Sequence, residues 1–238
     1  MPAMETYAVS SDISGKRFLA ALGAAVGTSA VTGALSYVLL RFLDSSSRSQ
    51  AIVFIVYTTL VVTLCAFFSP VTKAPIGLRF TSLKHLLASV GLLIATLGVT
   101  ALSYRLMSPV FGDLFSLVRQ IAAFATDAKR LQGQPVAAWI IAIPRGVLLV
   151  PLFEEVLFRG LLLAWLRKHL REDLAVISMA ALFALEHGSF AVAPYAFLLG
   201  ITMGYVKLRT GSIFNTFAMH FLNNLFLLAI GLKLFGHS

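Results

Sequence analysis

The sequence predicts an all-α protein that spans a membrane several times, with about seven transmembrane helices and one interfacial amphipathic helix. Three observations favour this fold class. Of the 238 residues, 58% are hydrophobic and only 12% are charged, whereas a soluble domain carries about 25% charged residues. The mean hydropathy is +0.88. Apolar runs recur along the chain at lengths near the roughly 20 residues that a helix needs to cross a bilayer.

The N-terminal part of the chain supplies three of the expected spans. We interpret residues 1–17 as a polar tail, because the apolar run that follows Lys16 and Arg17 is too long for a signal peptide. The stretch 105–135 mixes charged and apolar residues too evenly to span a membrane, and it is the expected interfacial helix. The three spans lie at about 18–40, 51–70 and 86–104, with a polar link over 41–50.

The C-terminal part, residues 136–235, supplies the other four spans and carries polar side chains inside apolar runs. Its first span holds Pro144 and Pro151, and two prolines so close together argue for a kinked or broken helix. The chain therefore divides into a tail (1–17), an N-terminal section (18–135) and a core (136–235), all within one compact membrane domain. The core spans lie at about 136–166, 174–190, 192–206 and 212–235.

The distribution of Lys and Arg predicts how the chain is oriented. Ten of these residues lie on the side of the membrane that bears the N-terminus, seven lie on the other side, and two lie within spans. Basic residues are enriched in cytoplasmic loops, so we expect a cytoplasmic N-terminus. The formal charge of +9 is explained by topology and by contact with lipid head groups, and no nucleic-acid partner is expected.

Residues 151–160 place two carboxylates and an arginine inside an apolar run. Ionisable groups are costly in hydrocarbon, so such a cluster is a candidate functional site. Glu155 and Arg159 are four residues apart, share a helix face and suit an ion pair. Glu154 is rotated by about 100° from its neighbour, which leaves it available for acid or base chemistry. A purely structural network of buried ions is the alternative reading.

Polar residues on two later spans are predicted to lie at a similar depth. With a rise of about 1.5 Å per residue, Glu154 lies about 18 Å from the basic end of its helix, and His187 about 20 Å. On the last span, His220 lies at about 12 Å and Asn224 at about 18 Å, one helical turn apart on one face. Asn223 competes with Asn224 for the same role.

Glutamate, histidine and asparagine side chains gathered at one depth of the membrane suit the hydrolysis of an amide. A glutamate and a histidine can activate water, and a second histidine with an asparagine can donate hydrogen bonds to an oxyanion. The same residue types leave open a metal site at Glu154, His187 and His220. A transporter with a proton relay is a further reading, which the lack of visible internal repeats disfavours.

Three motifs at these positions resemble the CAAX prenyl protease and bacteriocin-processing family of intramembrane endopeptidases. The family's EExxxR pattern is present from Glu154 to Arg159, its FxxxH pattern from Phe183 to His187, and its HxxxN pattern from His220 to Asn224. The motifs occur in order on successive predicted spans. The resemblance covers residues 136–235, and the first three spans add little beyond hydropathy.

The resemblance implies a function and a role for each residue. Glu154 would be the general base, assisted by His187, and no catalytic metal or other cofactor would be needed. Arg159 would hold Glu155, while His220 and Asn224 would form the oxyanion hole. The substrate would be a membrane-associated or lipidated protein or peptide, cut near its C-terminus or leader, in a bacterial inner membrane. A non-catalytic scaffold or immunity protein of the same fold is the alternative.

Overall fold

The computed structural model describes residues 15–68, 77, 79–111, 133–188 and 192–235, and within these ranges all regular structure is helical. The prediction of an all-α membrane protein is therefore confirmed. Five helices in the described residues are long and apolar enough to cross a membrane: Leu19–Leu39, Ser45–Leu64, Leu83–Val110, Val136–Leu166 and Ile213–Lys233. The expected count of seven spans is not reached among these residues, because two of the core helices are shorter or less apolar than expected.

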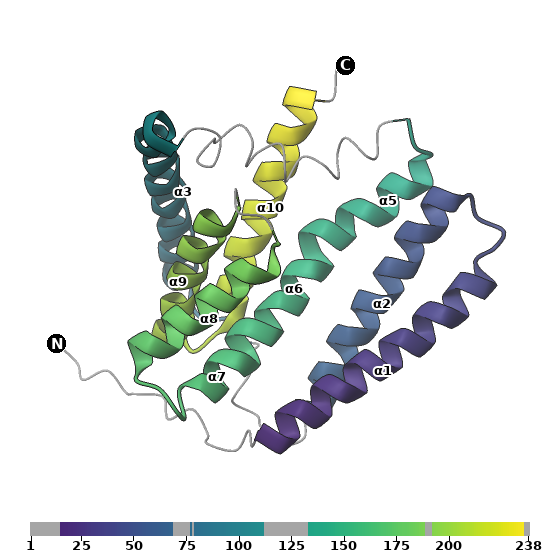
Figure 1. Ribbon diagram of the computed structural model, residues 1–238, viewed down its shortest axis with the longest axis horizontal. Helices are drawn as coiled ribbons and strands as arrows, with labels where there is room; N and C mark the ends of the chain where they lie inside the picture. The colour runs from purple at the N-terminus through teal and green to yellow at the C-terminus, as the bar shows by residue number, and fades with distance from the viewer. Residues whose placement is uncertain (1–14, 69–76, 78, 112–132, 189–191, 236–238) are drawn as a thin grey trace.

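Helices α1 (Gly15–Leu39) and α2 (Ser45–Phe68) form a hairpin that lies beside the α5–α7 run (Figure 1). The helix α2 begins at Ser45, so the expected polar link over 41–50 is wrong for most of its length. The reason is a side-chain cap: Asp44 Oδ1 accepts hydrogen bonds from the backbone N–H groups of Ser46 (3.0 Å) and Ser47 (2.9 Å). This cap lets the serines form the first turn of the helix.

Helix α3 (Leu83–Phe111) is longer than the span expected at 86–104. Residues 105–111, which the sequence assigned to the interfacial helix, continue α3 instead, and that part of the prediction is wrong. At 29 residues the helix exceeds the roughly 20 needed to cross a bilayer. Its last turns can therefore leave the hydrocarbon, where Arg105 is tolerated. The remainder of the expected interfacial helix, over 112–132, lies outside the described residues.

One continuous helical run carries the two adjacent glutamates (Figure 1). Of the kinked or broken helix predicted at the prolines, the break is therefore wrong. A π-helical segment over 145–149 lies between Pro144 and Pro151, and Pro144 keeps helical angles (φ −59°, ψ −35°). Proline has no N–H, and a π turn shifts the hydrogen bonds of its neighbours by one residue. The run comprises α5 (Val136–Pro144), η2 (Arg145–Leu149), α6 (Val150–Glu154), η3 (Glu155–Leu162) and α7 (Leu163–Leu166).

The helices α8 (Glu172–Glu186) and α9 (Ala193–Thr210) form a second hairpin, and α10 (Ile213–Phe235) follows. The span expected at 174–190 is wrong at its far end, because α8 has only 15 residues and Gly188 leaves it with φ +60°. The end expected for the span at 192–206 is also wrong, because α9 continues to Thr210. Lys207 and Arg209 form the last turn of α9, which ends on Gly211 at φ +65°.

Helix α9 packs closely against α8 at Gly200. A Cβ atom there would lie 2.9 Å from Ala180 Cβ, 3.0 Å from Ala180 Cα and 3.4 Å from the Phe183 ring. Small residues allow this spacing between membrane helices. We expect Gly200→Ala to lower the free energy of unfolding by about 1–3 kcal/mol through overpacking, and so to lower the thermal unfolding temperature measured in micelles. Gly98→Ala is the control, since no atom lies within 4 Å of its Cβ position; equal behaviour of the two variants would contradict the prediction.

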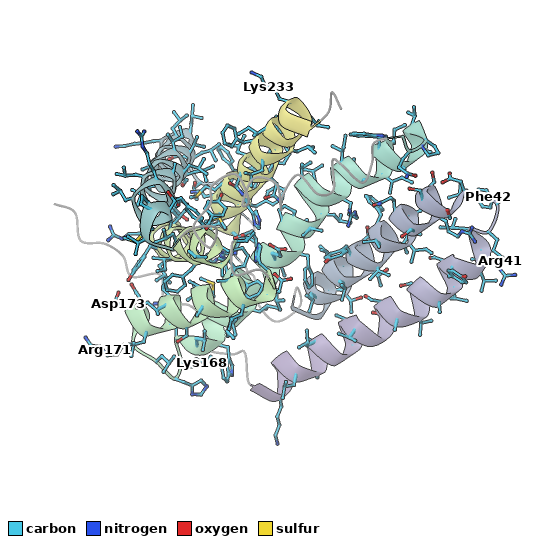
Figure 2. The ribbon with its side chains drawn as sticks, turned by 45° about the horizontal axis from the view of Figure 1, so that its top comes forward. Arg41, Phe42, Lys168, Arg171, Asp173 and Lys233 are labelled. Carbon is cyan, nitrogen blue, oxygen red and sulfur yellow. The ribbon has the colours of Figure 1, made fainter. Side chains whose placement is uncertain are left out.

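Charged side chains lie at the ends of the bundle, and apolar ones cover its sides. Figure 2 shows Lys168, Arg171 and Asp173 around the α7–α8 turn, Arg41 at the far end of α1, and Lys233 at the end of α10. The exposed large side chains along the helices are apolar, including Leu35, Val62, Ile94 and Ile140. This distribution is that of an integral membrane protein. The cytoplasmic location of the N-terminus stays a prediction.

Candidate active site

The ion pair predicted from the spacing of Glu155 and Arg159 is present. Arg159 Nη1 lies 2.9 Å from Glu155 Oε1, and both side chains are fully buried in η3. The same carboxylate oxygen lies 3.0 Å from His220 Nδ1 on α10. Arg159 and His220 thus hold Oε1 of this carboxylate, and the contact with His220 joins η3 to α10. Oε2 of Glu155 has no hydrogen-bond partner among the described residues.

Glu154 is also buried but is less engaged. Its Oε2 lies 3.5 Å from His220 Nε2, and its side chain is 9% exposed. Oε2 has no hydrogen-bond partner within the described part of the chain. Burying a carboxylate oxygen without a hydrogen-bond donor costs free energy, so its presence in a folded protein calls for an explanation such as a catalytic role. Because Arg159 and His220 already engage Oε1 of Glu155, Glu154 is the carboxylate with more capacity left to accept a proton or a hydrogen bond.

His220 lies between the two carboxylates. Its Nδ1 faces Glu155, and its Nε2 faces Glu154. Because an ionised carboxylate only accepts hydrogen bonds, the Nδ1 atom carries a hydrogen and donates it to Glu155. This contact orients the ring and directs Nε2 toward Glu154, as a second group commonly orients a catalytic imidazole.

Phe183 on α8 lies against three of the candidate site residues. The Arg159 guanidinium carbon is 4.1 Å from the centroid of its ring. The rings of His187 and His220 pack nearly perpendicular to it, at centroid distances of 4.8 and 5.9 Å. A cation over an aromatic face is worth about 2 kcal/mol or more when desolvated. Sequence reasoning gave Phe183 no role beyond its place in a motif.

His187 is the first residue after α8, and not an interior helix residue as expected. Its Nδ1 lies 2.8 Å from the carbonyl oxygen of Phe183. A carbonyl only accepts, so Nδ1 carries the hydrogen and Nε2 of the neutral ring keeps its lone pair. The side chain is 18% exposed, more than that of His220. The carboxylate of Glu186, 3.7 Å from Nδ1, is 46% exposed and extends outward.

Asn224 is joined to a neighbouring helix by its side-chain amide. Its Nδ2 donates to the carbonyl of Gly146 in η2 (3.0 Å), and its Oδ1 accepts from Asn223 Nδ2 (3.2 Å). Asn223 Oδ1 in turn accepts from the Tyr195 hydroxyl. Asn223 is 1% exposed, and its amide is engaged on both sides. Asn223 and Asn224, which the sequence left as competitors for one role, thus occupy different positions. The side chain of Asn223 supports that of Asn224 through a hydrogen bond.

Sequence reasoning missed several residues around the site. Thr216 lies one helical turn before His220, and a buried polar residue at that spacing is a signal that could have been followed. Tyr195 and Gly146 carry no signal of their own, because they meet the site only through contacts between helices. No group of three or more His, Cys, Asp or Glu residues that could hold a metal ion occurs in the described ranges.

Comparison with known proteins bears on the same part of the chain. Residues 136–226 match the family model described as type II CAAX prenyl endopeptidase Rce1-like. The match runs from the start of α5 into α10, and all six residues predicted for the site lie within it. It covers less than half of the chain and leaves α1, α2 and α3 outside. No curated protein and no solved structure matches the chain.

Proposed function

We propose that this protein is a membrane protease that activates water with Glu154, because residues 136–226 match the type II CAAX prenyl endopeptidase Rce1-like family model. The family indicates proteolysis of a protein or peptide in a membrane. One observation carries the choice of Glu154. Glu155 is committed through Oε1 to Arg159 (2.9 Å) and His220 (3.0 Å), whereas Glu154 lies 3.5 Å from His220.

The proposed reaction is a direct hydrolysis. Glu154 takes a proton from a water molecule as the water oxygen forms a bond to the carbonyl carbon of the substrate. The resulting oxyanion collapses, the C–N bond breaks, and Glu154 returns the proton to the leaving amine. His187 assists through Nε2, because its Nδ1 hydrogen is committed to the Phe183 carbonyl.

His220 and Asn224 form the proposed oxyanion hole. Glu155 orients His220, which donates to the oxyanion through Nε2 when the ring carries a proton on both nitrogens. Asn224 has one amide hydrogen beyond the one that it gives to Gly146. Donors held in place before the reaction stabilise the developing charge without reorganisation. Loss of a single such donor costs about 10²- to 10³-fold in kcat in other hydrolases.

The proposed substrate is a membrane-associated or lipidated protein or peptide, cut near its C-terminus or leader. The burial of Glu154 and His220 among apolar helices supports this class, because a peptide that enters from the bilayer brings little water. A bacterial inner membrane and a cytoplasmic N-terminus complete the proposal.

The test uses the full chain in liposomes. Two quenched-fluorescence peptides, one farnesylated at a C-terminal CaaX cysteine and one unmodified, are added in water enriched in ¹⁸O. We expect cleavage with one ¹⁸O in the new carboxylate, and faster cleavage of the farnesylated peptide. In parallel, peptide termini are compared in membranes from cells that carry the wild type or Glu154→Gln. Uncleaved peptides together with identical termini in the two membranes would rule out the proposal.

A further inference from the structure

A chain of hydrogen bonds runs from α9 through α10 to η2. The Tyr195 hydroxyl donates to Asn223 Oδ1, Asn223 Nδ2 donates to Asn224 Oδ1 (3.2 Å), and Asn224 Nδ2 donates to the Gly146 carbonyl (3.0 Å). Tyr195 is 2% exposed and Asn223 is 1% exposed. Each donor points the same way along the chain, from the Tyr195 hydroxyl to the backbone of η2.

The backbone explains why this chain ends at Gly146. In η2 the N–H of Val150 bonds to the carbonyl of Arg145, five residues back, rather than to Gly146. The next N–H in this register would belong to Pro151, which has none. The Gly146 carbonyl therefore lacks its helical donor, and a backbone carbonyl inside a protein needs a partner. Asn224 supplies that hydrogen bond from the neighbouring helix.

The carbonyl of Gly146 also determines the direction of the whole chain. A carbonyl can only accept, so Asn224 must present its NH₂ group to Gly146 and its oxygen to Asn223. Asn223 must then present its own NH₂ group to Asn224 and its oxygen to Tyr195, whose hydroxyl donates. An isolated asparagine amide can rotate by half a turn and exchange its oxygen and nitrogen. Here the Gly146 carbonyl opposes that rotation at one end, and the Tyr195 hydroxyl stabilises the same arrangement at the other by donating to Asn223 Oδ1.

We propose that Tyr195 and Asn223 are positioning residues that keep the Asn224 amide oriented as a hydrogen-bond donor to the oxyanion. The inference rests on the proposed function, which assigns Asn224 to the oxyanion hole. An NH₂ group has two hydrogens, and Gly146 takes one of them. In the rotated state Asn224 would offer its oxygen to a developing negative charge. The hydrogen-bond chain excludes that state before substrate binds.

The first test removes one hydroxyl. Tyr195→Phe leaves the ring in place but ends donation to Asn223, and we expect kcat for the farnesylated CaaX peptide to fall about 5-fold, the equivalent of one hydrogen bond. The KM should change by less than about 2-fold, since the amide acts on the transition state. The matched control is Tyr205→Phe on the same helix, whose hydroxyl donates to exposed Asp173 (2.6 Å). It should leave kcat unchanged.

A double-mutant cycle separates positioning from general damage to the fold. In an Asn224→Ala background, Tyr195→Phe should have no further effect on kcat, because the residue that it orients is gone. Multiplicative losses would overturn the inference and leave the proposed function standing. A wild-type kcat in Asn224→Ala alone would remove the oxyanion role, and the inference would fall with that part of the proposed function.

A second measurement does not depend on the substrate. The chain has only three asparagines, at positions 215, 223 and 224, so selective ¹⁵N-asparagine labelling yields three side-chain NH₂ signals. Tyr195→Phe should speed the exchange of the Asn224 NH₂ hydrogens with water, and Tyr205→Phe should not. An unchanged exchange rate in Tyr195→Phe would overturn the inference even if kcat falls, since the hydroxyl would then act by another route.

Discussion

Glu154→Gln is expected to lower kcat by at least about 10²-fold, and up to about 10⁴-fold, the range that a general base contributes. The substitution preserves size and shape but removes the ability to accept a proton from water. Protein stability should not fall with activity. Glu154 Oε2 is buried without a hydrogen-bond donor among the described residues, so a neutral amide there costs no more to bury than the carboxylate. The measurement is initial rate in liposomes beside thermal unfolding of the same preparation.

The control for this experiment is Glu172→Gln. The residue lies in the first turn of α8, its side chain is 54% exposed, and it pairs with Arg167 at 3.1 Å. Glu172→Gln makes the same chemical change at an exposed position, and the kcat of this variant should match that of the wild type. Wild-type turnover in Glu154→Gln would remove the general-base role. A retained cellular phenotype without turnover would instead favour a non-catalytic scaffold of the same fold.

Arg159→Met is expected to be the most destabilising single substitution in the core. The Arg159–Glu155 pair is fully buried at 2.9 Å, and removal of one partner strands the other charge. Breaking a buried pair in this way costs about 3–5 kcal/mol. The Phe183 ring loses its cation contact at the same time. Reversible unfolding in micelles measures the loss, and activity should disappear with it because His220 loses a fixed Glu155.

Two further variants show whether the broken Arg159–Glu155 pair causes the loss of stability in Arg159→Met. The double variant Glu155→Gln/Arg159→Met removes both charges and should recover part of the lost stability, because no buried charge is left alone. Arg167→Met breaks the exposed pair with Glu172, and such surface pairs contribute about 0–1 kcal/mol. Equal losses in Arg159→Met and Arg167→Met would mean that burial of the pair adds nothing to its strength.

The sequence alone determined the class of the protein and indicated where its candidate site lies. Composition and long apolar runs indicate a helical membrane protein, because hydrocarbon admits few charges and no unpaired backbone. The four-residue spacing of Glu155 and Arg159 predicts their ion pair, since that contact lies within one helix. The three motifs within residues 136–226 indicate the family for the same reason: each is a local pattern on a single predicted span.

Only the tertiary structure decided how those local patterns meet. It joins His220 to both glutamates, places Phe183 over Arg159, and separates the roles of Asn223 and Asn224. These contacts link side chains on different helices, whose rotation and relative height no spacing rule specifies. The backbone gives a further example that spacing rules do not predict. The π-helical turn before Pro151 leaves the carbonyl of Gly146 without a helical donor, and the side chain of Asn224, 78 residues later in the chain, supplies one.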